Sequence, residues 1–214
     1  EFIASAYKLQ VPHTPGTPLS LLVGRIFSMA SFGDVSKVAV SINLMSALFS
    51  ALTVTLVYYL ILFLCKGIAR PKHEFPGSLR ILSAAGGSLC LAFSDTFWFS
   101  AVEAETYGIA CFFLVLIVWL ILTGKALEEP LRSRRFVLIF YVAGLAYCIH
   151  PMCLLALPIL PFTWYTQARK LTFRNTIFSI LAGLILVLII NRFVAVGLFE
   201  LAFSLDLFLV NRLH

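Results

Sequence analysis

A small set of carboxylates and histidines has the chemistry for proton transfer, and its members come from separate stretches of the chain. The set consists of Glu1, His13, Glu103, Glu105, His150, Asp206 and His214. Carboxylate and imidazole groups are the usual general acids and bases of enzymes. Long apolar runs separate these residues, so the elements that position the runs decide whether the groups meet in one site.

The composition excludes a water-soluble domain. Of the 214 residues, 61% are apolar and only 12% are charged, and the mean hydropathy is +0.99. Soluble chains carry roughly 25% charged residues. The apolar residues form runs almost free of charge, at residues 38–65, 81–99, 107–123, 136–165 and 176–190. Runs of this length predict membrane helices, and the expected fold class is an all-α, polytopic transmembrane helical bundle.

Basic residues indicate how this bundle is oriented. Eleven of the sixteen Lys and Arg residues fall in three linkers, near residues 66–80, 125–135 and 169–174. The positive-inside rule predicts that all three linkers are cytoplasmic. The net charge of +6 therefore reports orientation in a bilayer and does not indicate a nucleic-acid partner. The segment near residues 95–105 has acids but no base, and we expect a short external loop there.

The apolar run 136–165 does not fit a single membrane crossing, because of its length and because of the basic residues that flank it. A single helix would extend ~45 Å and place the third basic linker outside. Two short helices that meet near His150 and Pro151 keep both flanking linkers inside, because proline disfavours helix at the residue before it. The sequence then predicts six crossings, near residues 38–65, 80–97, 107–124, 136–149, 153–166 and 175–191.

The first 37 residues are expected to form an external loop that contains a helix lying at the membrane interface. Thr17 and Pro18 are a typical helix start and Gly33 a typical stop, which predicts a helix over residues 18–32. Small residues recur along it at helical spacing and predict a packing face against another helix; they are Ser20, Gly24, Ser28 and Ser31. The expected organisation is a loop at 1–37, a bundle at 38–199 and an external interfacial segment at 200–214.

This topology brings the candidate acids and histidines to the external face, although each has a simpler interpretation. Glu103 and Glu105 are either a catalytic or cation-holding pair or a solvated loop beside aromatic residues. His13 is either a site residue or part of a turn stiffened by three prolines. Cys148-x-His150-x-x-Cys153 has the spacing of metal ligands, but Pro151 interrupts it and no fourth ligand is at hand, so no metal site is assigned.

Two motifs of the external loops resemble a known family. They are Glu1-Phe2-Ile3-Ala4-Ser5-Ala6 with Pro12-His13-Thr14-Pro15-Gly16, and Trp98-Phe99-Ser100-Ala101-Val102-Glu103-Ala104-Glu105-Thr106-Tyr107. They resemble a bacterial family of polytopic proteins, common in the Bacteroidota. That family is related to an endoplasmic-reticulum protein O-mannosyltransferase and belongs to the GT-C class of glycosyltransferases. The chain lacks an initiator methionine and a signal-type segment, and we expect it to be an internal piece of a longer membrane protein.

The resemblance implies a reaction and roles for the candidate residues. GT-C enzymes move a sugar from a polyprenyl-phosphate lipid to an acceptor at the outer membrane face, so a carboxylate takes the acceptor proton while a cation stabilises the leaving phosphate. Glu1 would belong to an Asp-x-x-Glu-Phe motif whose aspartate, the usual base, precedes it. Glu103 and Glu105 lie in the loop where oligosaccharyltransferases of this class keep a second acidic motif. Thr14 stands where wider O-mannosyltransferases have a proline.

The prediction is a membrane glycosyltransferase that transfers mannose or another hexose to an acceptor such as a protein hydroxyl. Its catalytic residues are Glu1, His13, Glu103 and Glu105, and its substrate-binding residues are Arg25, His150 and Arg192. Each arginine has snorkelling at the membrane interface as its alternative.

The expected partners are the lipid-linked donor, a protein or glycan acceptor and the bilayer, without nucleic acid. Mn²⁺ or Mg²⁺ is an optional cofactor. The expected location is a bacterial inner membrane with the site facing the periplasm. The alternative functions are a transporter or flippase subunit, for which an inverted repeat is expected, and a structural membrane protein.

Overall fold

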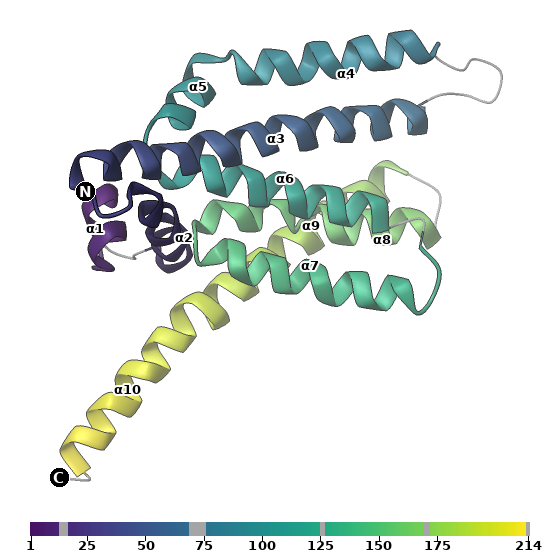
Figure 1. The fold of residues 1–214 in the computed structure, drawn as a ribbon. Coiled ribbons are helices and arrows are strands. Elements are labelled where there is room, and N and C mark those ends of the chain that lie inside the picture. The colour runs from purple at the N-terminus through teal and green to yellow at the C-terminus, as the bar shows by residue number, and fades with distance from the viewer. Residues whose placement is uncertain (13–16, 69–75, 125–126, 169–171, 213–214) are drawn as a thin grey trace. The chain divides into compact units, whose positions relative to one another are not determined.

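A computed structural model of the chain describes residues 1–12, 17–68, 76–124, 127–168 and 172–212. Every regular element in these ranges is a helix, which confirms the predicted all-α fold class (Figure 1). The chain divides into two compact units, Glu1–Leu154 and Leu155–His214. The first unit contains the candidate acids of both external motifs.

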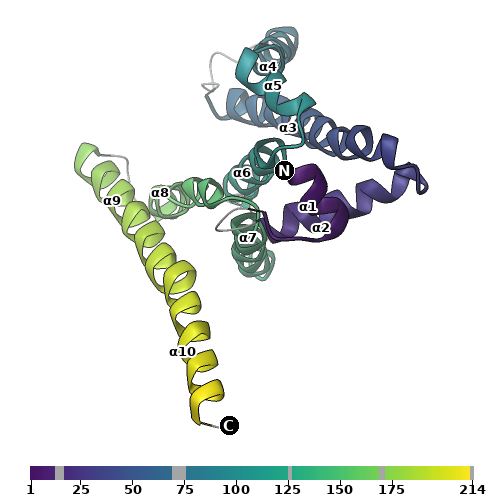
Figure 2. The ribbon, with the colours of Figure 1, turned by 90° about the vertical axis from the view of Figure 1, so that its left-hand side faces the viewer.

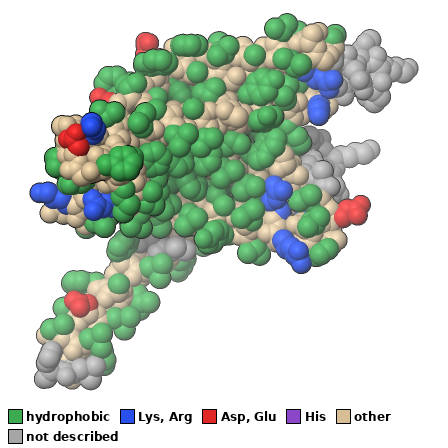
Figure 3. Space-filling view, viewed as in Figure 1, with side chains coloured by type: hydrophobic (Ala, Val, Ile, Leu, Met, Phe, Trp, Pro, Cys, Tyr) green, Lys and Arg blue, Asp and Glu red, His purple; other side chains and the backbone are tan. Residues whose placement is uncertain are grey.

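Four helices form the bundle of the first unit: α3 (Val38–Ile68), α4 (Gly77–Ala92), α6 (Thr106–Gly124) and α7 (Leu131–Tyr147). Helix α3 packs against α4 and α6, and α6 also packs against α7. Figures 1 and 2 show that α4 and α7 run antiparallel to α3 and α6. Large apolar side chains cover much of the bundle's outer surface (Figure 3), as expected of helices that face hydrocarbon.

Three helical runs of the described residues are long and apolar enough to cross a membrane: Val35–Gly67, Thr106–Gly124 and Phe173–Arg212. The first two coincide with the crossings predicted over 38–65 and 107–124. Helices α4 and α7 have 16 and 17 residues and lie at the lower limit for a crossing. The chain is therefore that of an integral membrane protein, and the total of six crossings stays a prediction.

The helix expected over residues 80–97 is shorter than predicted. It ends at Ala92, and a separate short helix, α5 (Asp95–Val102), follows a turn at Phe93 and Ser94. Ser94 is extended and Asp95 lies in the first turn of α5, where a carboxylate interacts favourably with the helix dipole. A new helix therefore starts at the point where the apolar pattern alone suggested continuation.

The predicted break in the run 136–165 is confirmed. Helix α7 ends at Tyr147, a 3-10 helix, η3, covers Pro151–Ala156, and α8 covers Ile159–Ala168. The second arm was expected to be helical from residue 153, but its α-helix begins only after Pro158, because the chain first turns in the tighter 3-10 form.

The first loop folds into two helices against the start of α3. Helix α1 covers Phe2–Lys8, and α2 covers Pro18–Ser28 and continues into the 3-10 helix η1 (Met29–Ser31). The expected stop is confirmed, because Phe32 and Gly33 both have positive φ angles. A second 3-10 helix, η2 (Val35–Lys37), leads into α3, and hydrogen bonds from Ser36 and Lys37 lower the pKa of Asp34 at its start.

The packing face predicted on the helix over residues 18–32 is confirmed. All four of its small residues are buried; they are Ser20, Gly24, Ser28 and Ser31. A Cβ atom on Gly24 would lie 2.9 Å from the Cβ of Ala6 in α1 and 3.9 Å from Ile42 of α3. A larger residue at this position would separate the helices, so the stripe allows α1, α2 and α3 to approach closely.

The second unit is a helical hairpin with a long continuation. Helix α8 packs against α9 (Phe173–Ile189), and Gly183 lies so close to Pro158 that a Cβ would come within 2.5 Å of the Pro158 Cα. The helical run that starts with α9 does not end near residue 191 as expected. After α9 it continues through a π-helical segment, η4 (Ile190–Val196), into α10 (Gly197–Arg212). The interfacial role predicted for 200–214 stays a prediction.

Candidate functional site

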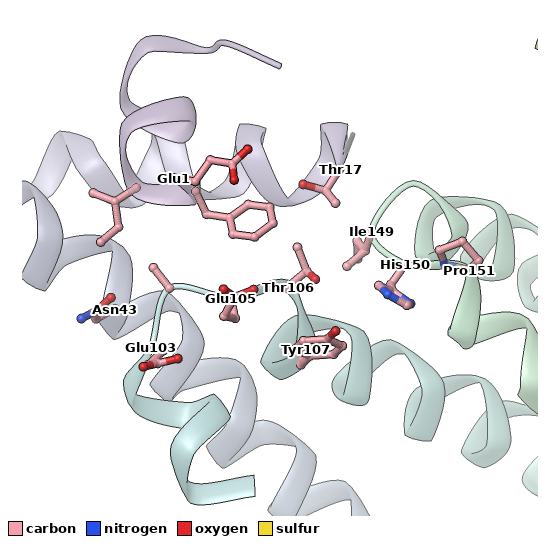
Figure 4. A pocket seen from close by; sticks show the side chains of 13 residues that line it. Glu1, Thr17, Asn43, Glu103, Glu105, Thr106, Tyr107, Ile149, His150 and Pro151 are labelled. Atoms are coloured by element: carbon pink, nitrogen blue, oxygen red, sulfur yellow. The ribbon is translucent and has the colours of Figure 1, made fainter. Parts of the chain in front are cut away.

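A cavity of about 740 Å³ lies at one end of the first unit (Figure 4). Its wall is formed by the starts of α1, α2 and α6, by the N-terminal part of α3, by the α5–α6 loop and by the segment after α7. The polar residues in this wall are Glu1, Thr17, Asn43, Glu103, Glu105, Thr106, Tyr107 and His150. Four residues that the sequence proposed for the site therefore line one cavity: Glu1, Glu103, Glu105 and His150.

The antiparallel topology explains why residues so distant in sequence meet here. The beginnings of α3 and α6 and the ends of α5 and α7 must lie at the same end of the bundle (Figure 1). Among the described basic residues of the first two linkers, Lys66 lies in the last turn of α3 and Arg132 in the first turn of α7, at the opposite helix ends. The stretch of α3 from Asn43 to Lys66 is ~35 Å long, close to the ~30 Å of a hydrocarbon core.

The two glutamates of the second motif are held in a tight turn between α5 and α6. Glu103 ends α5 in an extended conformation, and the Glu105 backbone N–H donates a hydrogen bond to the Glu103 carbonyl at 2.9 Å. Glu103 is exposed and Glu105 is half-buried. Both contribute to the cavity wall (Figure 4), which favours the interpretation as a site over a purely solvated loop.

His150 is fixed by its surroundings in one orientation. Its Nδ1 accepts a hydrogen bond from the Met152 backbone N–H at 3.2 Å, and its ring centroid lies 5.6 Å from that of Tyr107. A neutral imidazole whose Nδ1 accepts carries its proton on Nε2. His150 therefore offers an N–H donor in the wall of the cavity. The N–H of Leu19 donates to the Cys148 carbonyl at 3.3 Å and joins the start of α2 to the end of α7.

Helix α6 meets α3 closely just beyond the cavity. A Cβ on Gly108 would lie 3.1 Å from the Ser50 Oγ, 3.3 Å from the Ser46 carbonyl oxygen and 3.4 Å from the Ser100 carbonyl oxygen. The lack of a side chain at Gly108 allows the first turn of α6 to sit against α3. This contact fixes the position of Glu105 and Tyr107, which immediately precede it.

The two cysteines near His150, Cys148 and Cys153, differ in their environments. The Cys153 thiol is buried and donates to the Ala110 carbonyl oxygen at 3.5 Å, whereas Cys148 is exposed. In the part of the chain that the structure describes, no group of three His, Cys, Asp or Glu side chains is arranged to hold a metal ion. The role of Mn²⁺ or Mg²⁺ stays a prediction.

One predicted site residue of the first unit, Arg25, does not line the cavity. Its Nη1 donates to the Tyr7 carbonyl oxygen at 2.6 Å, and its guanidinium lies 5.2 Å from the Tyr7 ring centroid. Arg192 belongs to the second unit and forms an ion pair with Glu200 at 3.4 Å. His13 lies outside the described residues, and Asp206 belongs to the second unit.

Sequence reasoning missed four polar residues of the wall. Thr106 and Tyr107 directly follow the second acidic motif, and Asn43 is a lone amide near the start of the first apolar run. Thr17 was interpreted only as a helix cap, yet its side chain makes no capping bond, and its Oγ is buried without a hydrogen-bond partner. An isolated amide in a membrane helix was the signal that could have identified Asn43.

A second cavity of about 870 Å³ adjoins the first. Glu103, Glu105 and Tyr107 line both cavities. Of the nine other residues of the second wall, five are apolar, Leu91, Phe97, Phe99, Cys111 and Met152, and four are polar, Ser94, Asp95, Thr96 and Ser100. The acidic motif thus forms part of both walls.

The fold and the cavity together define a polytopic helical membrane protein with an acidic pocket at the end opposite its first two basic linkers. Residues 1–173 match the family described as the protein O-mannosyl-transferase TMEM260 N-terminal domain, and the chain belongs to this family. The mouse (Mus musculus) protein O-mannosyl-transferase TMEM260 is 29% identical over 176 residues, which cover 79% of this chain and 22% of the mouse protein.

The chain therefore spans about a fifth of the length of that curated relative. No solved structure matches the chain. The comparisons confirm the predicted relationship to protein O-mannosyltransferases, whereas the bacterial family and the GT-C class stay predictions.

Proposed function

We propose that this chain forms the reaction centre of a membrane glycosyltransferase, which transfers mannose or another hexose from a polyprenyl-phosphate carrier to a hydroxyl of a protein or glycan acceptor. The observation that carries the proposal is the single cavity in which Glu1, Glu103, Glu105 and His150 meet. The name of the mouse relative, a protein O-mannosyl-transferase, supports the same reaction.

The residues of the cavity suit a direct displacement at the sugar. A carboxylate takes the proton of the acceptor hydroxyl while the acceptor oxygen forms a bond to C1 of the sugar. The bond between C1 and the phosphate oxygen breaks, and polyprenyl phosphate leaves with the electron pair. The Nε2–H of His150 donates a hydrogen bond to an oxygen of the departing phosphate or of the acceptor. Glu1 supplements the base, and Glu105 positions the acceptor or holds a cation.

The two adjoining cavities suit the two halves of an amphiphilic donor. In the proposal, the polyprenyl chain lies along the apolar side chains of the second cavity, beside Phe97 and Phe99, and the sugar occupies the first cavity beside Glu1. The wall formed by Glu103, Glu105 and Tyr107 then lies next to the bond that breaks. The described ends of the first two basic linkers lie at the other end of the bundle, which by the positive-inside rule supports a reaction on the external face, in a bacterium the periplasmic face of the inner membrane.

The test is a transfer assay with purified full-length protein. Radiolabelled polyprenyl-phosphate-mannose is incubated with a panel of serine- and threonine-containing polypeptides and glycans, and label in the acceptor is counted. Glu105→Gln and Glu1→Gln remove a charge at nearly constant shape, and each should lower turnover by about 10² to 10⁴. Glu128→Gln makes the same change at an exposed site outside the cavity wall and should leave turnover unchanged.

Two results would contradict the proposal. Normal turnover in both cavity variants, at normal protein level, removes these glutamates from the mechanism. Absence of transfer to every acceptor, together with movement of the labelled lipid across vesicles containing the protein, identifies a flippase.

A further inference from the structure

Glu1 directly precedes helix α1 (Phe2–Lys8) and lines the cavity, so the contacts that hold α1 bear on where Glu1 lies. Ser5 and Ala6 are buried, and Ala6 lies at the close approach to Gly24 of α2. This apolar contact fixes the distance between the two helices but supplies little directional restraint.

Arg25 supplies the directional contact. Its Nη1 donates to the carbonyl oxygen of Tyr7 at 2.6 Å, in the last turn of α1, where carbonyl groups lack partners within the helix. A positive charge at this end is also favoured by the helix dipole. The same guanidinium lies 5.2 Å from the centroid of the Tyr7 ring, within the range of a cation–π interaction. One side chain of α2 thus holds both the backbone and the side chain of Tyr7.

We infer that Arg25 is a positioning residue, which fixes α1 on α2 and so holds the Glu1 carboxylate at the cavity, and that it does not bind the donor phosphate. Neither Arg25 nor Tyr7 lines either of the two cavities described above. The effect of this contact on turnover rests on the proposed function, whereas its effect on α1 does not.

Hydrogen exchange of the full-length protein tests the structural part. Peptides that cover Phe2–Lys8 are followed by mass spectrometry in the wild type, Arg25→Gln, Arg25→Lys and Tyr7→Ala. Loss of the charged hydrogen bond should speed exchange in α1 by roughly tenfold or more in Arg25→Gln, and Arg25→Lys, which keeps a charged donor, should restore part of the protection. Lys37→Gln removes an exposed positive charge from the same loop and should leave exchange in α1 unchanged.

Turnover in the transfer assay tests the link to Glu1. Arg25→Gln and Tyr7→Ala should each lower kcat by about tenfold with an unchanged KM for the lipid-linked donor, because a displaced Glu1 weakens the chemical step. The double variant should be no worse than the more affected single variant, because both changes break one contact. If Arg25→Gln does not accumulate, Arg25→Lys and Tyr7→Ala still report on the same contact.

The outcomes separate this inference from the proposed function. Unchanged exchange in α1 for Arg25→Gln and Tyr7→Ala overturns the positioning role, whatever the protein catalyses. A raised KM for the donor with normal exchange would show that Arg25 binds the phosphate. Faster exchange in a protein that transfers no sugar would retain the structural role of Arg25 and refute only the glycosyltransferase.

Discussion

The imidazole ring of His150 lies against the phenol ring of Tyr107, with 5.6 Å between the ring centroids. The contact joins the segment after α7 to the first turn of α6, and both residues line the acidic cavity. Because the Met152 backbone N–H donates a hydrogen bond to Nδ1, a neutral His150 carries its proton on Nε2. We therefore expect His150 to act as a hydrogen-bond donor in the cavity rather than as the base.

Two substitutions test the roles of the two ring nitrogens of His150 separately. His150→Asn keeps an acceptor near Nδ1 for the Met152 N–H but loses the distal donor, and it should lower turnover by about 10² while the fold is retained. His150→Gln places an amide donor near the position of Nε2 and should be milder. Transfer rates and protein yield of both variants provide the measurement. Equal losses in the two variants would mean that the donor at Nε2 is not used.

The close contact at Gly108 predicts a sharp effect of one methyl group. Gly108→Ala brings a Cβ within 3.3 and 3.4 Å of two backbone carbonyl oxygens, which cannot rotate away. We expect a loss of about 1–3 kcal/mol in stability, together with lower turnover, because Glu105 directly precedes α6.

Gly144→Ala is the matched control for this change. Gly144 lies inside α7, and its Cβ would meet nothing within 4 Å. Replacing a helical glycine there should raise stability by about 0.5–1 kcal/mol. Thermal unfolding in detergent measures both variants, and similar Tm values for the two would show that α6 and α3 do not require this close approach.

The orientation of the first unit predicts which loops an impermeant reagent reaches. In a cysteine-free background, a maleimide added to intact cells should modify Lys37→Cys, which precedes α3 near the cavity end. It should modify Ser133→Cys, at the opposite end, only after the membrane is opened. A probe at Lys170 should behave like the one at Ser133. Labelling of the Lys170 probe in intact cells would mean that the run 136–165 crosses the membrane once.

His13 lies outside the described residues, and its role is predicted from sequence. Three prolines, at positions 12, 15 and 18, predict a stiff loop, in which a side chain would lose little entropy on being held. His13→Ala should lower turnover without lowering the amount of membrane-inserted protein, and His13→Gln, which keeps a donor, should be milder. If both variants fail to accumulate while the residual protein is fully active, His13 is a structural turn residue.

The sequence by itself determined the helices, the membrane and the acidic motif. Charge-free apolar runs predicted α3 and α6, Pro151 predicted the break after α7, and the small residues around Gly24 predicted a buried face. These features follow from local chemistry: hydrophobic length, proline sterics and side-chain size act within a few turns of one helix. The end of the helix at Ala92 and the continuation past residue 191 were not predicted, because long apolar runs contain little boundary information.

Only the tertiary structure decided which polar groups share the cavity. Asn43, Thr17 and Tyr107 join the two glutamates of the second motif because antiparallel helices bring their ends together, whereas Arg25 turns to Tyr7. The direction of a side chain depends on the angle and depth at which its helix packs against neighbours distant in sequence. A basic residue near an acidic motif in the chain can therefore lie outside its cavity, and an isolated amide in an apolar run can lie within it.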